Sequence, residues 1–552
     1  MFARTLVIVP AIIAVLFAAG VAGAQVLPVR LYGGAANEEC HALVEGLGGG
    51  FCLAGWTRSF GPTGNSNVLV VKTDPAGIPV WARVSAGKYD EEARAMVRTS
   101  NNCYTLAGWT RSYGPGTPNK NIFIEKLDAA GNHLWGRVYG GLADDEVFSI
   151  VETADSGYAL AGLTHSFGPN PKPNIIVLKL DQWGLLQWMR AYWFTPMHIE
   201  DEGYSIVQTP DLGYAVCGRA KAMGPALYNP FLLKLDPVGN IQWVQVAGAN
   251  YSDEAYSVAL DIANNVMVAG RTLSFGTAPG AFQDMFVAKF TLSGVLVWSR
   301  TYGWSNGDEE VLDDRSLVGT QDAGAAVCGL TTSVGPGIPN PNFLILKLDP
   351  MGIPQWCRSH PSPYHPGLQS DVPLPMIELA AGGYAVGGWT NSFPTLIGGA
   401  DFMLSTFDPA GNREVCVEPQ EPVVMEMPWI QARMTDSMCY PDHDTIFLVP
   451  VDVRHDSVCY VETGLDEHDT ERGNVGFVLR GSGRNVELTL ARPTMVEIQV
   501  FTTDGRQVAR IAPREYAAGK QLVSIPGYAL AGAYVARAIG GGQVASTKIV
   551  MF

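Results

Sequence analysis

The residues of this chain best suited to chemistry are acidic side chains that recur in short clusters. Most clusters follow an arginine of a W-x-R sequence or its equivalent (Arg30, Arg83, Arg137, Arg190, Arg300 and Arg358). The clusters are Glu38-Glu39, Asp90-Glu91-Glu92, Asp144-Asp145-Glu146, Glu200-Asp201-Glu202, Asp253-Glu254 and Asp308-Glu309-Glu310. Carboxylates repeated in this way can pair with arginine across a structural joint, or ring a channel mouth and bind a cation. Their recurrence at one phase of a repeat favours the arginine–carboxylate pairs.

A second group of candidate ligands lies late in the chain. His443, His455 and His468 each precede an aspartate, and such pairs could ligate zinc or calcium. Their spacings match no familiar ligand pattern, so a solvated acidic linker is the favoured interpretation. The sequence holds no nucleophile elbow, phosphate-binding loop, H-E-x-x-H or paired C-x-x-C motif, so it assigns no catalytic or cofactor-binding residue. The metal-binding residues stay unknown.

Composition narrows the class of protein that positions these residues. Of the 552 residues, 62 are glycine and only 16% are charged, while 47% are hydrophobic, which is typical of an all-β protein with many turns. The formal net charge of −16 argues against a nucleic-acid partner. Residues 1–24 have the form of a secretory signal peptide, with Arg4, an apolar run from Leu6 to Val21 and an Ala-Gly-Ala cleavage pattern. We expect a mature protein that does not span the membrane.

The chain repeats itself with a period near 54 residues. One marker is a tryptophan after a glycine turn, at Trp81, Trp135, Trp188, Trp243, Trp298 and Trp356, with successive spacings of 54, 53, 55, 55 and 58. A second marker is the glycine ending an apolar run, at Gly55, Gly108, Gly162, Gly218, Gly270, Gly329 and Gly388. Each unit contains four candidate strands, and seven such units predict a seven-bladed β-propeller over residues 25–416.

Two details of this propeller follow from the repeat. Residues 26–34 resemble the fourth strand of a unit but precede the first full unit, so they should complete the last blade and close the ring. In the D-x-x-G-x-x-x-W corner, aspartate should cap the turn, glycine should adopt a positive φ, and the indole should pack on a neighbouring blade. The tryptophans are therefore interpreted as structural blade corners.

The repeated units, for instance "GNHLWGRVYGGLADDEVFSIVETADSGYALAGLTHSFG", resemble the secreted bacterial family of seven-bladed propeller repeat proteins. The tryptophan corner also resembles the docking motif of quinoprotein propellers. These resemblances imply the fold and leave the function open, because propellers have many unrelated activities.

The last 70 residues differ from the repeats. The run V-x-I-x-V-F-x-x-D-G-R-x-V (496–508), the run L-A-G-A-Y (530–534) and a terminal lysine are similar to the C-terminal sorting domain of type IX secretion cargo. That resemblance implies a small β-sandwich over 483–552, with Asp504, Gly505, Gly532, Tyr534 and Lys548 as its motif residues. It also implies a type IX-like secretion machinery as partner, and a secreted or outer-membrane surface location.

The segment between these two parts, 417–482, begins with the Pro/Glu-rich run "EPQEPVVMEMP" and is predicted to be a linker or a small β segment. Its Cys439 and Cys459 are the candidate disulfide pair. Cys52, Cys217 and Cys328 lie in apolar runs and are predicted to be small core residues.

The favoured function is a binding or structural module without catalytic activity and without a cofactor. Irregular connections at 192–202 and 360–373 are candidate binding segments. The alternatives are a propeller enzyme, either a quinoprotein-like oxidoreductase or a hydrolase using channel carboxylates, and a carbohydrate-binding lectin suggested by loop aromatics such as Phe60 and Tyr113. The extracellular ligand could be a glycan or a protein, and calcium or another cation in the channel stays open.

Overall fold

The computed structural model consists of β-strands and connecting turns. It describes residues 29–61, 64–168, 172–194, 200–221, 228–334, 341–360, 371–391, 399–412, 423–426, 477–482, 485–490, 493–502, 507–517, 519–524, 532–540 and 543–551. Within these ranges there is no helix long and apolar enough to cross a membrane. The predicted signal peptide, the Cys439–Cys459 pair and the three His-Asp pairs lie outside the described residues.

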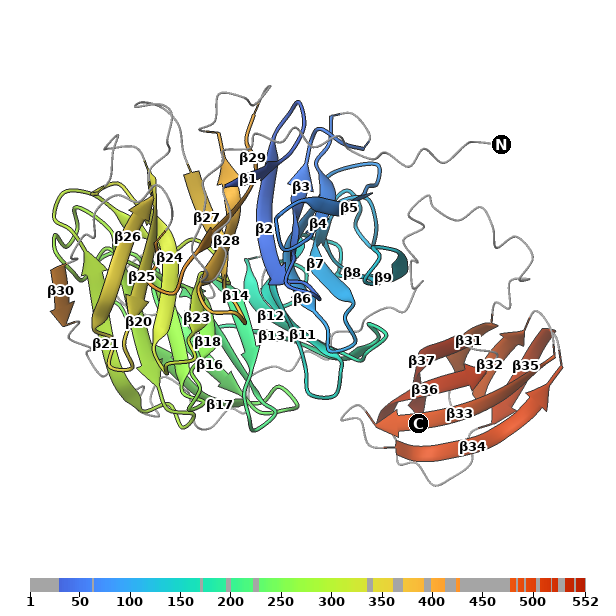
Figure 1. Ribbon diagram of the computed structural model, residues 1–552. Coiled ribbons are helices and arrows are strands. Elements are labelled where there is room, and N and C mark those ends of the chain that lie inside the picture. The colour runs from blue at the N-terminus through green and yellow to red at the C-terminus, as the bar shows by residue number, and fades with distance from the viewer. Residues whose placement is uncertain are drawn as a thin grey trace. The chain divides into compact units, whose positions relative to one another are not determined.

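Seven antiparallel sheets, the blades, surround a common axis (Figure 1). The strands of the first four blades are β2 (Glu38–Glu45), β3 (Phe51–Thr57), β4 (Asn67–Thr73) and β5 (Pro79–Ser85); β6 (Glu91–Arg98), β7 (Tyr104–Thr110), β8 (Asn121–Leu127) and β9 (His133–Tyr139); β10 (Asp145–Glu152), β11 (Tyr158–Thr164), β12 (Asn174–Leu180) and β13 (Leu186–Tyr192); β14 (Asp201–Gln208), β15 (Tyr214–Ala220), β16 (Asn229–Leu235) and β17 (Ile241–Val246).

The remaining three blades include two departures from the repeat. Their strands are β18 (Asp253–Leu260), β19 (Val266–Thr272), β20 (Asp284–Phe290) and β21 (Leu296–Gly303); β22 (Glu309–Glu310), β23 (Leu317–Gly319), β24 (Ala325–Thr331), β25 (Asn342–Leu348) and β26 (Pro354–His360); β27 (Asp371–Glu378), β28 (Tyr384–Thr390) and β29 (Asp401–Phe407). In blade 6 the first strand is split into β22 and β23. In blade 5, β30 (Val423–Glu426) adds a fifth strand beside β21.

The ring closes through the N-terminal strand, as the repeat predicts. Strand β1 (Arg30–Tyr32) pairs antiparallel with β29, with Leu31 opposite Met403, and supplies the fourth strand of blade 7. Its Tyr32 hydroxyl donates to the Gly77 carbonyl of blade 1 at 2.7 Å. The first and last blades are thereby joined by chain segments about 370 residues apart.

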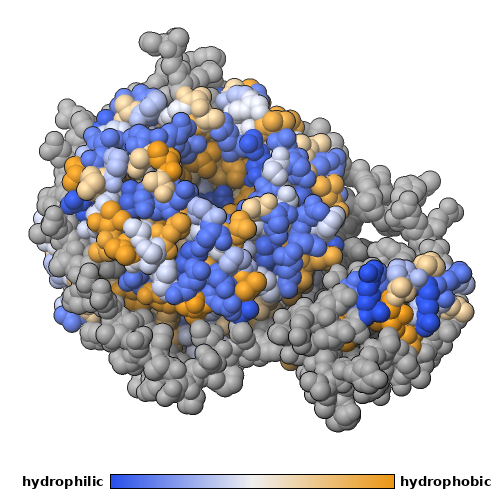
Figure 2. Space-filling view, turned by 90° about the horizontal axis from the view of Figure 1, so that it is seen from below, coloured by the Kyte–Doolittle hydropathy of each residue, from blue (hydrophilic) through white to orange (hydrophobic). Residues whose placement is uncertain are grey.

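The hydrophobic core lies between blades. The second and third strands, such as β3 and β4, are buried along their whole length because each sheet packs against two neighbours. One core cluster joins Ala42 and Val70 of blade 1 to Tyr104 and Phe123 of blade 2. Large exposed hydrophobic residues, including Trp183 and Met351, are scattered over the turns, and the face in Figure 2 mixes hydrophobic patches with hydrophilic ones.

Blades are joined at the D-x-x-G turns. In blade 1 the Asp74 carboxylate accepts hydrogen bonds from the Ala76 and Ile78 amides, and Gly77 has a φ of 73°. The fourth-strand tryptophan of one blade lies on the glycine turn of the next, as Trp298 does on Gly352. The Trp298 indole also donates to the Pro350 carbonyl at 3.0 Å. The same packing on turn glycines places Trp81, Trp135, Trp243 and Trp356, and Trp188 contacts Tyr214 of the next blade edge to face.

The C-terminal unit is a separate body of strands. It contains β31 (Phe477–Ser482), β32 (Asn485–Leu490) and β35 (Gly519–Ser524) in one sheet, and β33 (Thr494–Thr502), β34 (Gln507–Tyr516), β36 (Gly532–Gly540) and β37 (Gln543–Met551) in another. Gly532 begins β36, Tyr534 pairs with Ile549, and Lys548 pairs with Val535. Asp504 and Gly505 lie outside the described residues. The sandwich and its sorting role stay predictions.

The packing of tryptophan on glycine can be tested with matched alanine substitutions. An added Cβ at Gly352 would lie 2.7 Å from the Trp298 ring, whereas one at Gly48, with a similar positive φ, would meet nothing within 4 Å. We expect Gly48→Ala to lower the free energy of unfolding by about 1 kcal/mol through backbone strain alone. Gly352→Ala should lower it by about 2 to 4 kcal/mol, since overpacking adds to that strain. Equal losses in urea unfolding would contradict the proposed contact.

Candidate functional site

A ring of glutamates surrounds one end of the propeller axis. Six of the seven first strands begin with an acidic pair, and the second member of each pair occupies the same register position: Glu39, Glu92, Glu146, Glu202, Glu254 and Glu310. In blade 7 this position is Val372. The first strands are the innermost ones and contact one another, so the fold brings these side chains together. We call this set the glutamate ring.

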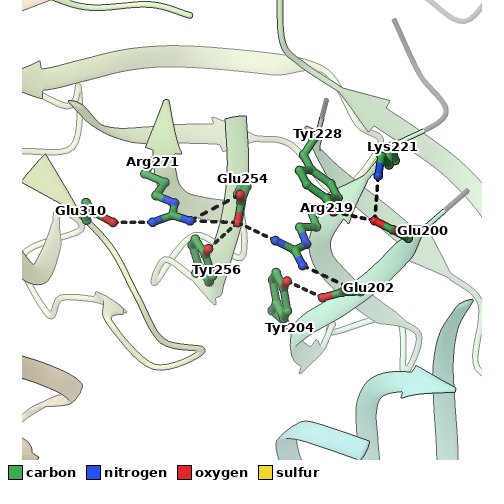
Figure 3. Close-up of polar contacts among 10 residues, drawn as sticks. All are labelled: Glu200, Glu202, Tyr204, Arg219, Lys221, Tyr228, Glu254, Tyr256, Arg271 and Glu310. Carbon is green, nitrogen blue, oxygen red and sulfur yellow. Dashed lines mark hydrogen bonds and ion pairs between the residues drawn. The ribbon is translucent and has the colours of Figure 1, made fainter. Parts of the chain in front are cut away.

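Arginines of the second strands neutralise the ring over blades 4 to 6 (Figure 3). Arg219 lies between Glu202 of its own blade at 3.0 Å and Glu254 of the next blade at 3.3 Å. Arg271 likewise joins Glu254 to Glu310. The bidentate, planar guanidinium suits such bridging, and its charge stays fixed at any physiological pH.

Aromatic side chains fill the spaces between these ion pairs. Tyr204 and Tyr256 stack with ring centroids 5.0 Å apart, and their hydroxyls donate to Glu202 and Glu254. The Arg219 guanidinium lies over the Tyr228 ring at 4.3 Å. Burial raises the pKa values of both stacked tyrosines far above the ordinary value, so they remain neutral donors.

The ring has a different composition over blades 1 to 3. Glu92 pairs with Arg94 at 3.0 Å and Glu146 with Lys120 at 2.8 Å, while Glu39 lies 3.8 Å from the His41 imidazole and near Arg94. The Glu39 side chain is 31% exposed, more than that of Glu92 or Glu146. Burial, reinforced by the nearby Glu92 carboxylate, raises the pKa of Glu39 above its usual range. Here the ring keeps accessible donors and acceptors side by side.

Two of the arginines singled out in the sequence, Arg30 and Arg83, donate to backbone carbonyls, so the arginine–carboxylate interpretation is wrong for them. Arg83 donates to the Gly131 carbonyl at 2.8 Å and Arg30 to the Ala76 carbonyl at 3.0 Å, both in the turn of the next blade. The reason is strand order: W-x-R arginines lie on the outer fourth strand, while the acidic clusters begin the inner first strand. Whether the ring binds a cation stays a prediction.

The first acid of each pair has a structural role. Glu38 is buried and accepts from the Thr57 hydroxyl at 2.7 Å and the Gly34 amide at 2.8 Å, and equivalent bonds recur in other blades. In two blade joints this acid meets a second carboxyl group, because the third strand begins with Asp284 or Asp401 where five blades have asparagine. The pKa of Asp401 is raised to about 7, first by burial and then by the Glu38 carboxylate.

Beneath the ring, a loop of blade 6 occupies the axis. In blade 5 a single bulged residue, Tyr256, separates the register pairs Ala255–Gly270 and Ser257–Ala269. In blade 6 the corresponding bulge is expanded into the loop 312–315, between Val311, which follows β22, and Ser316, whose carbonyl accepts from the Cys328 amide. The 58-residue spacing between Trp298 and Trp356 is the sequence signal of this insertion. We call these four residues the axial loop.

The axial loop contacts blades on every side. The Asp314 carbonyl accepts from the hydroxyls of Ser205 and Ser257, at 2.9 and 2.7 Å. Arg315 donates to the Ile150 carbonyl of blade 3 at 2.8 Å, and its own carbonyl accepts from the Met376 amide of blade 7 at 2.9 Å. On the side of blade 1, Asp313 lies 3.9 Å from the His41 ring. The loop therefore crosses the channel that the sequence predicts, and no sequence pattern indicated that the insertion points toward the axis.

Other predicted features are placed as follows. Cys52, Cys217 and Cys328 are buried free thiols, as the apolar runs indicate. His198 and most of the irregular segments at 192–202 and 360–373 lie outside the described residues. Among the residues that are described, no group of three or more His, Cys, Asp or Glu side chains is arranged to hold a metal ion.

Comparison with known proteins gives distant similarities only. No family model matches the chain. The regulatory protein FlaEY of Caulobacter vibrioides is 24% identical over 281 residues, which cover 45% of this chain and 29% of that protein. The chain therefore spans less than a third of that relative's length. Solved structures include the polysaccharide lyase Uly1 (9% identity, 68% of this chain, 91% of that chain, TM-score 0.42) and a puromycin hydrolase mutant (10%, 70%, 55%, 0.42).

These comparisons correct one prediction. The sequence analysis favours a protein without catalytic activity, yet the matched structures include a lyase and a hydrolase. The prediction that the chain is not an enzyme is therefore wrong. Propellers have many unrelated activities, so this fold gives no ground for excluding catalysis.

The carboxyl pair at the joint of blades 7 and 1 predicts a pH dependence of stability. The folded protein holds a proton on Asp401 up to about pH 7, whereas the unfolded chain releases it near pH 3.8, so stability falls as the pH rises between these values. Asp401→Asn, which restores the residue found at this position in blade 1, should raise the melting temperature at pH 8 by several degrees and change it little at pH 4.

The reciprocal substitution provides the control. Asn67→Asp places a second carboxyl beside Glu91 and should introduce a new loss of stability above neutral pH. Calorimetric melting of both variants from pH 4 to 8.5 measures the effect. An Asp401→Asn melting curve that follows the unmodified protein at every pH would contradict the shared proton.

Proposed function

We propose that the protein is an exported, ligand-binding β-propeller whose glutamate ring receives a polyhydroxylated ligand such as a glycan. The observation that carries this proposal is the close mixture of fixed acceptors and donors around the ring. Glu39 and Glu92 lie beside Arg94, and all three side chains are between 16% and 31% exposed. Sugar hydroxyls can donate to carboxylates and accept from guanidinium groups at the same site.

Charge balance favours this ligand class over ionic ones. Each carboxylate over blades 2 to 6 has a cation beside it, as Glu146 has Lys120 and Glu254 has both Arg219 and Arg271. A strongly cationic or anionic ligand would have to displace these pairs and leave a buried charge without its partner. A neutral ligand rich in hydroxyls can bind without breaking them. Aromatic side chains beside the glutamate ring, such as Tyr228, offer additional apolar contact to a ligand.

Binding can be tested with two substitutions in one strand. Glu39→Gln removes a charged acceptor of the ring, whereas Glu45→Gln alters a glutamate at the opposite end of β2. We expect the purified full chain to bind a subset of an oligosaccharide array, and Glu39→Gln to weaken that binding about tenfold through loss of one charge-assisted hydrogen bond. Glu45→Gln should bind normally.

The same oligosaccharides are analysed for bond cleavage after incubation, which decides whether the bound ligand is also a substrate. Absence of binding across the array would contradict the proposal. Equal affinities of the Glu39→Gln and Glu45→Gln variants would also contradict it, because the ligand would then lie away from the ring.

Export is the second part of the proposal. Its support is the similarity of 496–508 and 530–534 to sorting domains of type IX cargo, a segment that includes parts of β33 and β36. The propeller strands pair among themselves and with β30, and residues 483–552 fall in the other unit, so the propeller does not depend on them for strand pairing.

Deletion of 483–552 should therefore leave the propeller folded and stop its delivery to the cell surface or medium. Circular dichroism of the truncated protein tests folding, and immunodetection of intact cells and medium tests delivery. Normal yield of the truncated protein outside the cell would contradict the sorting role while leaving the binding site untested by that result.

A further inference from the structure

The axial loop brings together polar atoms that lack hydrogen-bond partners. Within the described chain, both ring nitrogens of His41, Oδ1 of Asp313 and both carboxylate oxygens of Asp314 are buried and have none. Asp314 and His41 are only 5% and 6% exposed. Buried polar groups are almost always satisfied, so several unsatisfied ones in one place indicate a ligand or ordered water.

The charges around these buried oxygens favour a positively charged ligand. Asp313 and Asp314 are adjacent carboxyl groups on the axis. Of the two nearest arginines, Arg94 pairs with Glu92, and Arg315 donates to the neutral Ile150 carbonyl, so a single unpaired arginine charge stands against the two carboxyl groups. Among the described ion pairs, Asp313 has only His41, and Asp314 has none.

The surrounding groups offer oxygen ligands. The Ser149 hydroxyl lies beside the Asp314 carboxyl group and accepts a long hydrogen bond from the Ile206 amide at 3.3 Å. Equivalent serines, Ser205 and Ser257, hold the Asp314 backbone in place. Carboxylates with a hydroxyl and water are the ligands that calcium prefers, and its flexible coordination tolerates an incomplete protein cage.

We propose that Asp313 and Asp314 bind one calcium ion on the propeller axis, with water and the Ser149 hydroxyl completing its coordination. The ion would neutralise the two carboxylates and pin the axial loop to the blades around it. Because the site lies beneath the glutamate ring and uses none of its residues, this proposal is independent of glycan binding.

The test measures metal content and heat stability of the full chain. After dialysis against a chelator and then against calcium, the unmodified protein should retain one calcium per chain by elemental analysis. Its melting temperature should rise on addition of calcium. Asp314→Asn should lose the bound ion and the calcium-dependent shift, whereas Glu45→Gln, at the end of a neighbouring inner strand, should keep both.

Asp313→Asn gives a second variant in case Asp314→Asn fails to fold, and it should weaken calcium binding at least tenfold in titration calorimetry. The proposal is overturned if the unmodified protein retains no calcium and shows no shift, since the carboxyl groups would then share a proton. It is also overturned if both aspartate variants bind calcium as tightly as the unmodified protein.

Discussion

The structure depends on the contact between the fourth strand of one blade and the D-x-x-G turn of the next. A tryptophan packs on a glycine that has no Cβ, an arginine donates to the turn carbonyls, and a tyrosine hydroxyl donates to the glycine carbonyl. Each of these contacts contributes little stability by itself. Together they recur around the propeller, which is stable only if its circle of blades closes. The seventh joint uses Arg30 and Tyr32 of β1 against the turn of blade 1, so the N-terminal segment completes the fold.

This outer construction leaves the inner strands free to carry different side chains. In the six first strands that begin with an acidic pair, the two acids have different roles: the first is buried and accepts hydrogen bonds from a loop, and the second belongs to the glutamate ring. Second-strand residues then determine the character of the ring, with Arg219 and Arg271 on one side and tryptophans Trp56 and Trp109 on the other. The ring is therefore asymmetric on a nearly symmetric scaffold.

The sequence predicted what depends on local spacing. Tryptophans about 54 residues apart and turn glycines such as Gly77 predicted the blades, their joints and the closing strand, because the residues that form each of these features recur in one repeat unit. Prediction from the sequence failed where the partner of a side chain depends on the order of strands in the fold. Arg83 precedes an acidic cluster along the chain, yet it lies on the outer rim while the cluster lies at the axis. The three-residue insertion in blade 6 was visible as a longer spacing, but its direction into the channel depends on bulges that no local pattern reports.

The closed ring is tested most directly by a disulfide across its last joint. Leu31 of β1 and Met403 of β29 are register partners, so cysteines at both positions lie within reach of a disulfide bond. The account predicts that the Leu31→Cys, Met403→Cys protein forms this bond under mild oxidation and that the bond raises the melting temperature. A protein in which the two cysteines remain reduced, while folding is normal, would show that β1 does not close the propeller.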